Sequence, residues 1–167
     1  MKKAVYAGTF DPITVGHLDI VERASKIFDE IVVAVAVDNY KKNLFSLEER
    51  VSLVRDSVKH LSNVSVDSFS GLLVDYCIKV GSSTILRGLR AVADFEADFQ
   101  MVMMNRNLSD KIDTVFLMSD QQYLFVSSSI VKEAAVVGGN ISGLVPPLVE
   151  KCLLAKLAAK ESKELRY

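Results

Sequence analysis

The sequence predicts a single α/β domain in which five parallel strands form a doubly wound sheet. Strand-like and helix-like segments alternate along the chain, and no linker or repeat interrupts them. Strands buried on both faces of a parallel sheet are nearly continuous apolar runs. The hydrophobic fraction, 50% of 167 residues, fits such a sheet and would also fit an oligomer interface.

Five segments have the composition or alternation of strands. Ile31–Val37 is a β-branched run typical of a buried strand, and Val64–Phe69 alternates polar with apolar residues. The three shorter candidates are Lys3–Ala7, Thr84–Leu86 and Thr114–Met118.

Helices are expected between these strands and after the last one. Ser46 and Glu49 form a capping box, which predicts a helix that runs to about His60. The other helical patterns cover Gly16–Phe28, Leu72–Val80, Asp94–Leu108, Ser129–Val137 and Pro146–Lys160. We therefore divide the chain into one domain, residues 1–160, and a polar tail, residues 161–167, that is expected to fray.

Composition excludes several classes of function. The net charge is −1 without a block of Lys and Arg, so we expect no nucleic-acid partner. With two histidines and two distant cysteines, Cys77 and Cys152, we expect no metal site built by the protein and two buried free thiols. No apolar run is long enough for a signal peptide or a membrane span, so we expect a cytoplasmic protein without a membrane partner.

In a doubly wound sheet, ligands bind beyond the carboxyl ends of the strands, where the strand order reverses. The residues that follow the five expected strands should therefore share one edge. These residues are 8–10, 38–42, 69–73, 87–90 and 119–129.

The segment G-T-F-D-P-I-T-V-G-H, residues 8–17, combines features that suit a phosphate. Gly8 lets a ligand approach the backbone, and Pro12 sets a turn. A helix then begins, whose free N–H groups and dipole favour an anion, and His17 adds a side-chain donor. The alternative is an ordinary β–α turn with a solvent-facing histidine.

Two basic clusters fall on the same edge. Lys41 and Lys42 could hold a phosphorylated substrate or could form an exposed charged loop, and we expect Lys42 to be solvated. Arg87 and Arg90 offer planar donor forks that match phosphate oxygens. Alternatively, these arginines lie on the surface and pair with Asp94 or Glu96.

Two further groups are ambiguous. Ser127, Ser128 and Ser129 precede a helix, where one serine could cap it and all three could form an anion cradle. Met101 and Met104 have helical spacing and belong either to the core or to a ligand site. The motifs of dinucleotide-binding folds, P-loop kinases and serine hydrolases are missing from the sequence, so no covalent nucleophile is expected.

Several motifs together resemble a known family. The T-x-G-H of residues 14–17 resembles the first signature of the nucleotidyltransferase superfamily. The stretches I-L-R-G-L-R-A-V-A-D-F-E (85–96), M-N-R (104–106) and F-V-S-S-S-I-V-K-E (125–133), with the lysines at 41 and 42, are similar to bacterial phosphopantetheine adenylyltransferases. The resemblance covers nearly the whole chain.

The resemblance implies a Rossmann-like nucleotidyltransferase fold and a specific reaction. AMP would pass from ATP to 4′-phosphopantetheine, giving dephospho-coenzyme A and pyrophosphate. The attack would be in line, without a covalent enzyme intermediate, and Mg²⁺ would be delivered with ATP. The family also implies a homohexamer and feedback by coenzyme A.

The resemblance assigns roles to individual residues. It implies catalytic roles for His17, Lys41 and Arg90. ATP would contact Thr9, Phe10, His17, Gly88, Leu89, Arg90, Asp98, Tyr123, Leu124, Phe125, Val126, Ser127, Ser128 and Ser129. The acceptor would contact Thr9, Lys41, Leu73, Arg87, Met104 and Asn105.

The chain departs from the family pattern at three positions. Ala7 replaces a frequent proline, Val15 a frequent asparagine, and Asp98 the glutamate expected to contact ATP. Asp98 is one methylene shorter, so we expect it to face ATP through a water; a closer helix, a missing contact or a solvated acid are alternatives. Two other functions stay open, namely transfer to another phosphorylated acceptor and a non-catalytic nucleotide sensor.

Overall fold

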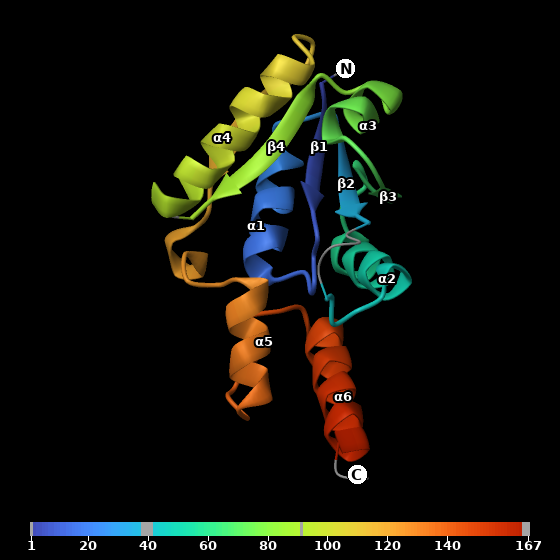
Figure 1. Ribbon diagram of the computed structural model, residues 1–167, viewed down its shortest axis with the longest axis vertical. Helices are drawn as coiled ribbons and strands as arrows, with labels where there is room; N and C mark the ends of the chain where they lie inside the picture. Colours follow the sequence, from blue (N-terminus) through green and yellow to red (C-terminus); the bar gives the residue numbers. More distant parts are fainter. Residues whose placement is uncertain (1, 38–41, 91, 165–167) are drawn as a thin grey trace.

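The computed structural model describes residues 2–37, 42–90 and 92–164, and its centre is a parallel sheet (Figure 1). The strands are β1 (Lys3–Gly8), β2 (Glu30–Ala36), β3 (Val64–Phe69), β4 (Thr84–Leu89) and β5 (Asp113–Met118). They lie in the order β3-β2-β1-β4-β5, and every pair of neighbours is parallel. This confirms the predicted sheet and places the reversal of strand order between β1 and β4.

Six helices and one 3₁₀ turn complete the described chain. They are α1 (Val15–Ala24), α2 (Leu47–Val58), α3 (Leu73–Lys79), α4 (Val92–Leu108), η1 (Gln121–Tyr123), α5 (Ser128–Val136) and α6 (Pro147–Glu164). The predicted capping box is present before α2, where Ser46 and Glu49 exchange hydrogen bonds. None of the described helices could cross a lipid bilayer, judged by length and hydropathy.

Some boundaries differ from the sequence prediction. Strand β4 continues past Leu86 to Leu89, because Gly88 and Leu89 still pair with Leu117 and Met118 of β5. Arg87 therefore lies inside the strand rather than after it. The 3₁₀ turn η1 was not predicted, and α6 extends beyond Lys160 to Glu164, into the segment expected to fray.

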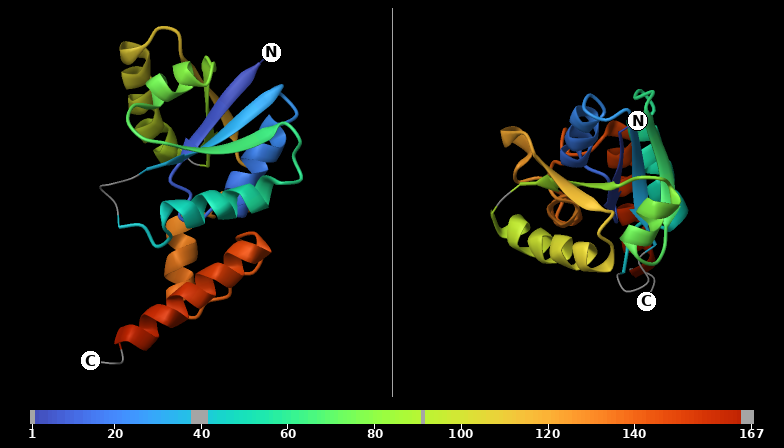
Figure 2. Two further views of the ribbon diagram at one scale, coloured as in Figure 1. Left: turned by 90° about the vertical axis from the view of Figure 1, so that its right-hand side faces the viewer. Right: turned by 90° about the horizontal axis from the view of Figure 1, so that it is seen from above.

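The sheet is covered on both faces, as Figure 2 shows. In β1, Ala4 and Tyr6 belong to the core beneath α1 and α2, whereas Val5 and Ala7 belong to the core on the α3 side. This alternation follows from the two-residue period of a strand. Cys77 of α3 is buried as predicted, and burial raises the pKa of its thiol to about 11. Cys152 is only half-buried, so that prediction was wrong in part.

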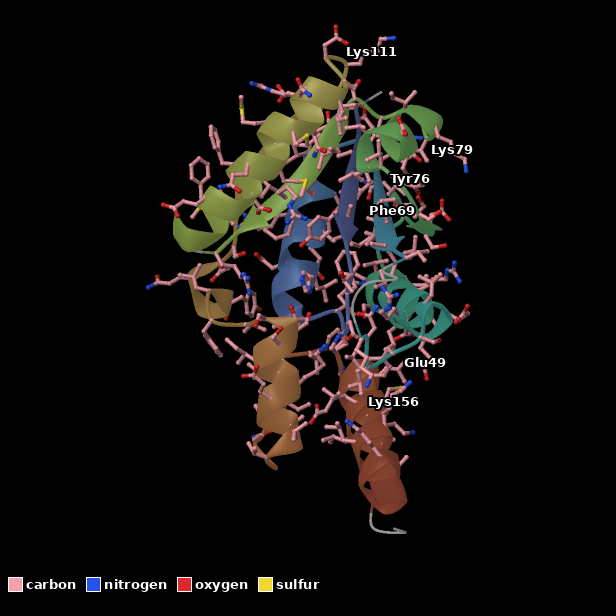
Figure 3. The ribbon with its side chains drawn as sticks, in the orientation of Figure 1. Glu49, Phe69, Tyr76, Lys79, Lys111 and Lys156 are labelled. Carbon is pink, nitrogen blue, oxygen red and sulfur yellow. The ribbon has the colours of Figure 1, made fainter. Side chains whose placement is uncertain are left out.

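Helices α5 and α6 extend beyond the carboxyl ends of the strands (Figures 1 and 2). Lys156 of α6 forms an ion pair with Glu49 of α2, and the two side chains lie together in Figure 3. The same ammonium group lies 4.9 Å from the centre of the Phe45 ring. These contacts fix α6 against the start of α2.

The absence of a side chain at Gly88 is required by packing against α1. A Cβ atom at Gly88 would lie 2.9 Å from Cγ1 and 3.3 Å from Cδ1 of Ile20, which is buried. The family resemblance places Gly88 among the residues that would contact ATP. The structure adds a reason internal to the fold, because α1 and β4 could not approach so closely with a larger residue.

We therefore expect Gly88→Ala to lower the free energy of unfolding by about 1–3 kcal/mol, the usual cost of overpacking a core. Gly16→Ala is the matched control, because its Cβ would find neighbours only at ordinary contact distances of 3.7 Å and beyond. Alanine is also favoured over glycine within a helix. Urea denaturation compares the two variants, and equal stability would contradict the packing argument.

Candidate functional site

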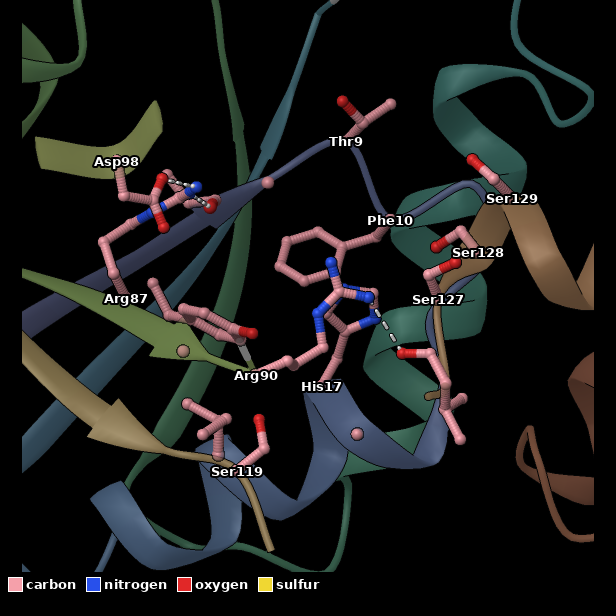
Figure 4. A pocket seen from close by; sticks show the side chains of 17 residues that line it. Thr9, Phe10, His17, Arg87, Arg90, Asp98, Ser119, Ser127, Ser128 and Ser129 are labelled. Atoms are coloured by element: carbon pink, nitrogen blue, oxygen red, sulfur yellow. Dashed lines mark hydrogen bonds and ion pairs between the residues drawn. The ribbon is translucent and has the colours of Figure 1, made fainter. Parts of the chain in front are cut away.

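A cavity of about 430 Å³ opens at the carboxyl ends of β1 and β4, where the strand order reverses (Figure 4). We call it the polar cavity, because arginine, histidine and serine side chains converge on it. Its wall comes from β1 and the loop after it, from α1, from β4, and from the start of α5. The lining residues are Tyr6, Ala7, Gly8, Thr9, Phe10, Gly16, His17, Ile20, Arg87, Gly88, Arg90, Asp98, Ser119, Val126, Ser127, Ser128 and Ser129.

The loop between β1 and α1 is fixed by Asp11, whose side chain is buried. Its carboxylate accepts hydrogen bonds from the backbone N–H groups of Leu44 and Phe45, each at 2.9 Å. It also accepts from Nζ of Lys132 in α5 at 2.7 Å. Three segments far apart in sequence therefore meet at one carboxylate, which sets the position of the loop relative to α5.

His17 caps its own helix through its imidazole ring. Nδ1 lies 3.1 Å from the backbone nitrogen of Thr14 and accepts its N–H in a capping box. A ring nitrogen that accepts a hydrogen bond carries no proton, so the neutral ring holds its proton on Nε2. The edge-on contact with Phe10, with ring centroids 5.2 Å apart, holds the ring in place.

The His17 ring is neutral at physiological pH. Burial is the main cause, and the positive charges of Arg90 and Arg87 add to it; together they lower the pKa to about 4. The side chain therefore presents a neutral N–H donor at neutral pH. This geometry excludes the solvent-facing histidine that sequence analysis left open.

Arg87 and Arg90 lie on the wall of the polar cavity and are held by different partners. Nη1 of Arg87 donates to the carbonyl oxygen of Ala7 at 3.2 Å, and Nη2 donates to Oδ1 of Asp98 at 2.6 Å. The carboxylate that pairs with Arg87 among the described side chains is therefore Asp98, which was not among the expected partners. Nη1 of Arg90 donates to the carbonyl oxygen of Val126 at 3.1 Å, which connects the end of β4 with the serine segment.

The sequence suggested that the three serines cap a helix or form an anion cradle, and the structure is compatible with both roles. Ser127 is the N-cap of α5, and its Oγ accepts the N–H of Ile130 at 3.1 Å. Oγ of Ser128 donates to the carbonyl oxygen of Pro12 at 2.7 Å, which joins α5 to the loop after β1. All three line the polar cavity, together with the amino-terminal end of α5. An anion placed there would meet hydroxyl groups and free N–H groups.

A second cavity, of about 390 Å³, adjoins the first between the sheet and helices α3 and α4. We call it the apolar cavity, after the side chains of Phe69, Leu73, Ile85, Met101 and Val102, with Asn105 as a polar member. Five residues form the wall that both cavities share: Ala7, Gly8, Thr9, Arg87 and Asp98.

Helix α4 turns Met101, not Met104, toward the apolar cavity. Met101 and Asn105 are four residues apart and so share one helical face, on which Asp98 also lies. Met104 is 55% exposed and lines neither cavity. Both methionines are exposed, so neither belongs to the core, which was one of the two possibilities that the sequence left open.

Most of the residues expected at the site line one of the two cavities, with several exceptions. Lys41 lies outside the described residues, and its neighbour Lys42 is exposed as predicted. Four members of the expected ATP set line neither cavity: Leu89, Tyr123, Leu124 and Phe125. Asp98 is not a solvated acid, because its side chain is 15% exposed and paired with Arg87.

Sequence reasoning missed Tyr6, a buried member of the polar cavity that packs against Phe10 with ring centroids 5.5 Å apart. Burial raises the pKa of its hydroxyl, so the side chain stays neutral. The signal in the sequence that could have identified Tyr6 was its hydroxyl group within the apolar strand that precedes Gly8. Ile20 and Val102 were missed as well, because only the tertiary fold brings them to the cavities. Phe69 and Ser119 lie in the segments expected at this edge, but no contact had been assigned to them.

Comparisons with known proteins agree with this arrangement. A family model described as cytidylyltransferase-like matches residues 5–134. The chain is 60% identical over 156 residues to a phosphopantetheine adenylyltransferase from Moorella thermoacetica, covering 93% of this chain and 98% of the relative. A relative of the same name from Syntrophomonas wolfei is 56% identical over 157 residues, covering 94% and 98%.

A solved structure shows a related fold. It is a protein from Vibrio parahaemolyticus assigned provisionally as a nicotinate-nucleotide adenylyltransferase. Its TM-score is 0.70 at 20% sequence identity, and the match covers 92% of this chain and 99% of that one. At this identity the likeness concerns the fold alone.

Proposed function

Because the chain belongs to the phosphopantetheine adenylyltransferase family, within the cytidylyltransferase-like group, we propose that it joins ATP and 4′-phosphopantetheine. The products are dephospho-coenzyme A and pyrophosphate. The observation that carries this proposal is the pair of adjoining cavities with a shared wall, because a two-substrate transfer needs two sites that meet where the phosphates react.

The two cavities match the two substrates by their chemistry. The polar cavity offers Arg90, the His17 donor and the amino-terminal end of α5, which suit the triphosphate of ATP. The apolar cavity offers Leu73 and Met101 for the pantetheine arm, with Asn105 available to its amide groups. Thr9 and Arg87 lie on the shared wall, where the acceptor phosphate would have to lie.

We propose a direct in-line attack of the acceptor phosphate on the α-phosphorus of ATP. The acceptor is an anion at neutral pH and needs no general base. The new P–O bond forms as the bond to pyrophosphate breaks, and charge develops on the transferring group and on the leaving group. The N–H on Nε2 of His17 and the Arg90 guanidinium would stabilise this charge, while Thr9, Arg87 and Lys41 would orient the acceptor.

Mg²⁺ would neutralise charge on the nucleotide phosphates. Within residues 2–37, 42–90 and 92–164, no three His, Cys, Asp or Glu side chains gather as a metal site. The side-chain oxygens of the polar cavity are the hydroxyl groups of Tyr6, Thr9 and the serines, and the carboxylate of Asp98, which already accepts from Arg87. This donor set suits a metal held mainly by the phosphate oxygens of ATP.

The proposal includes a cytoplasmic homohexamer that is subject to feedback by coenzyme A. Six of the described apolar side chains of α4 are 43–58% exposed, which favours association with other copies: Phe95, Phe99, Met101, Met103, Met104 and Leu108. Light scattering measures the assembly, and a monomer at micromolar concentration would contradict the homohexamer.

Feedback by coenzyme A would act at the apolar cavity. Coenzyme A carries the pantetheine arm and would compete for this cavity with the acceptor.

Pyrophosphate release from ATP, measured with and without 4′-phosphopantetheine, tests the proposed function. We expect release that depends on the acceptor. Release with another phosphorylated acceptor alone would favour a sister transferase. ATP binding without any release would favour a non-catalytic sensor.

We expect Arg87→Ala and Lys41→Ala to weaken binding of the acceptor by about tenfold to a hundredfold, as for the loss of a charge-assisted hydrogen bond. ATP affinity should change much less, because the family resemblance places both cations at the acceptor phosphate. Calorimetric titration with each substrate separately measures both affinities. A defect confined to ATP would mean that the two subsites are exchanged.

A further inference from the structure

Asp98 lies at the junction of the two cavities, where its carboxylate meets Arg87. Oδ1 of Asp98 is 2.6 Å from Nη2 of Arg87, and Figure 4 shows the two side chains pointing toward one another. The side chain of Asp98 is 15% exposed and that of Arg87 is 37% exposed. A short bond between a charged donor and a charged acceptor is among the stronger hydrogen bonds in proteins.

The Arg87 guanidinium is held at two points. Nη1 donates to the carbonyl oxygen of Ala7 in β1, and Nη2 donates to Asp98 in α4. A guanidinium has five N–H donors in one plane, so two fixed donors set the direction of the others. Without Asp98, the plane of the guanidinium would be held by a single hydrogen bond to a neutral acceptor, from Nη1 to the carbonyl oxygen of Ala7 at 3.2 Å.

We propose that Asp98 is a positioning residue that aims Arg87 at the acceptor phosphate and thereby sets the affinity for the acceptor. This inference rests on the proposed function, in which Arg87 binds that phosphate. It assigns Asp98 to the acceptor side of the reaction, whereas the glutamate expected at this position in the family was associated with ATP.

Asp98 has two opposing effects on the affinity of the site for the acceptor phosphate. Its negative charge partly cancels the charge of Arg87, which weakens attraction to a phosphate. Its hydrogen bond fixes the guanidinium, which favours the two-point geometry that arginine forms with phosphate oxygens. Because long side chains lose much rotamer freedom on binding, we expect orientation to outweigh charge.

Substitutions at position 98 separate these effects. Asp98→Asn keeps an acceptor oxygen and removes the charge, whereas Asp98→Ala removes both. Orientation predicts the acceptor affinity order Asp98, then Asn, then Ala, with Asp98→Glu close to the native protein. Charge compensation predicts the reverse, because both Asn and Ala would then bind the acceptor more tightly.

A double-mutant cycle tests whether Asp98 acts through Arg87. KM for 4′-phosphopantetheine, KM for ATP and kcat are measured by pyrophosphate release for the native protein, Asp98→Ala, Arg87→Ala and the double variant. We expect Asp98→Ala alone to raise KM for the acceptor about fivefold to tenfold, a coupling typical of side chains in contact. KM for ATP should change less than twofold, and in the Arg87→Ala background Asp98→Ala should add nothing.

Asp56→Ala is the matched control, because it breaks an ion pair with Lys59 on α2, and neither residue lines either cavity. It should leave both KM values unchanged. The inference would be overturned if Asp98→Ala still raised KM for the acceptor in the Arg87→Ala background, or if it raised KM for ATP instead. Tighter binding of the acceptor by both Asp98→Asn and Asp98→Ala would also overturn it. A native protein that releases no pyrophosphate would instead contradict the proposed function.

Discussion

We expect His17→Ala to fold normally but to lose about 10²–10³ in kcat, the usual effect of removing one donor aimed at transition-state charge. The ring is fixed by Thr14 and Phe10, and its protonated Nε2 is the remaining polar atom. Because this donor is placed before the reaction begins, its loss should affect turnover more than the binding of either substrate. Steady-state kinetics, together with circular dichroism as a check of folding, measures the effect.

The protonation state of His17 gives a second test of the same role. Since its pKa is lowered to about 4, the ring is already neutral throughout the range from pH 5.5 to 8. We therefore expect His17 to contribute no inflection to kcat near pH 6.5, the ordinary pKa of histidine. His17→Gln keeps a neutral N–H donor and should be more active than His17→Ala. An inflection near pH 6.5 that disappears in His17→Gln would show that the charged ring is the active form.

The fold could be predicted from the sequence because its signals are local. The apolar run at Ile31–Val37 and the Ser46–Glu49 capping box depend only on residues close in sequence. Both are present in the structure, apart from small shifts of the boundaries. The position of the polar cavity also followed, because the carboxyl ends of parallel strands meet at one edge. The end of β4 was misplaced because pairing with β5, a long-range contact, extends the strand over Arg87 and Gly88.

The contacts within the site could not be predicted in the same way. The choice of Met101 over Met104 depends on the rotation of α4 against the sheet, which helical spacing alone does not define. The partner of Arg87 is Asp98 on the next helix, whereas the sequence had suggested Asp94 or Glu96. Asp11 was passed over because its partners, Leu44, Phe45 and Lys132, are 33 to 121 positions away.

Asp11 should be among the residues whose loss costs the most stability. Its side chain is 5% exposed and accepts three hydrogen bonds, one of them from the partly exposed Lys132. Asp11→Ala leaves two backbone N–H groups without their acceptor and an ammonium without its counterion. We expect the free energy of unfolding to fall by about 3 kcal/mol, less than for a fully buried pair because Lys132 can reach water.

The pH dependence identifies the carboxylate as the cause. Burial alone would raise the pKa of Asp11, but the hydrogen bonds from Lys132 and from the N–H groups of Leu44 and Phe45 outweigh it and lower the pKa. Stability from a carboxylate with a lowered pKa is fully present above the unfolded pKa, about 3.9, and is lost as the pH falls through the folded value. The difference between the native protein and Asp11→Ala should therefore be constant from pH 6 to 8 and should shrink below about pH 4. Urea denaturation across this range measures it, and a difference that stays constant down to pH 3 would show that the charge of Asp11 does not stabilise the fold.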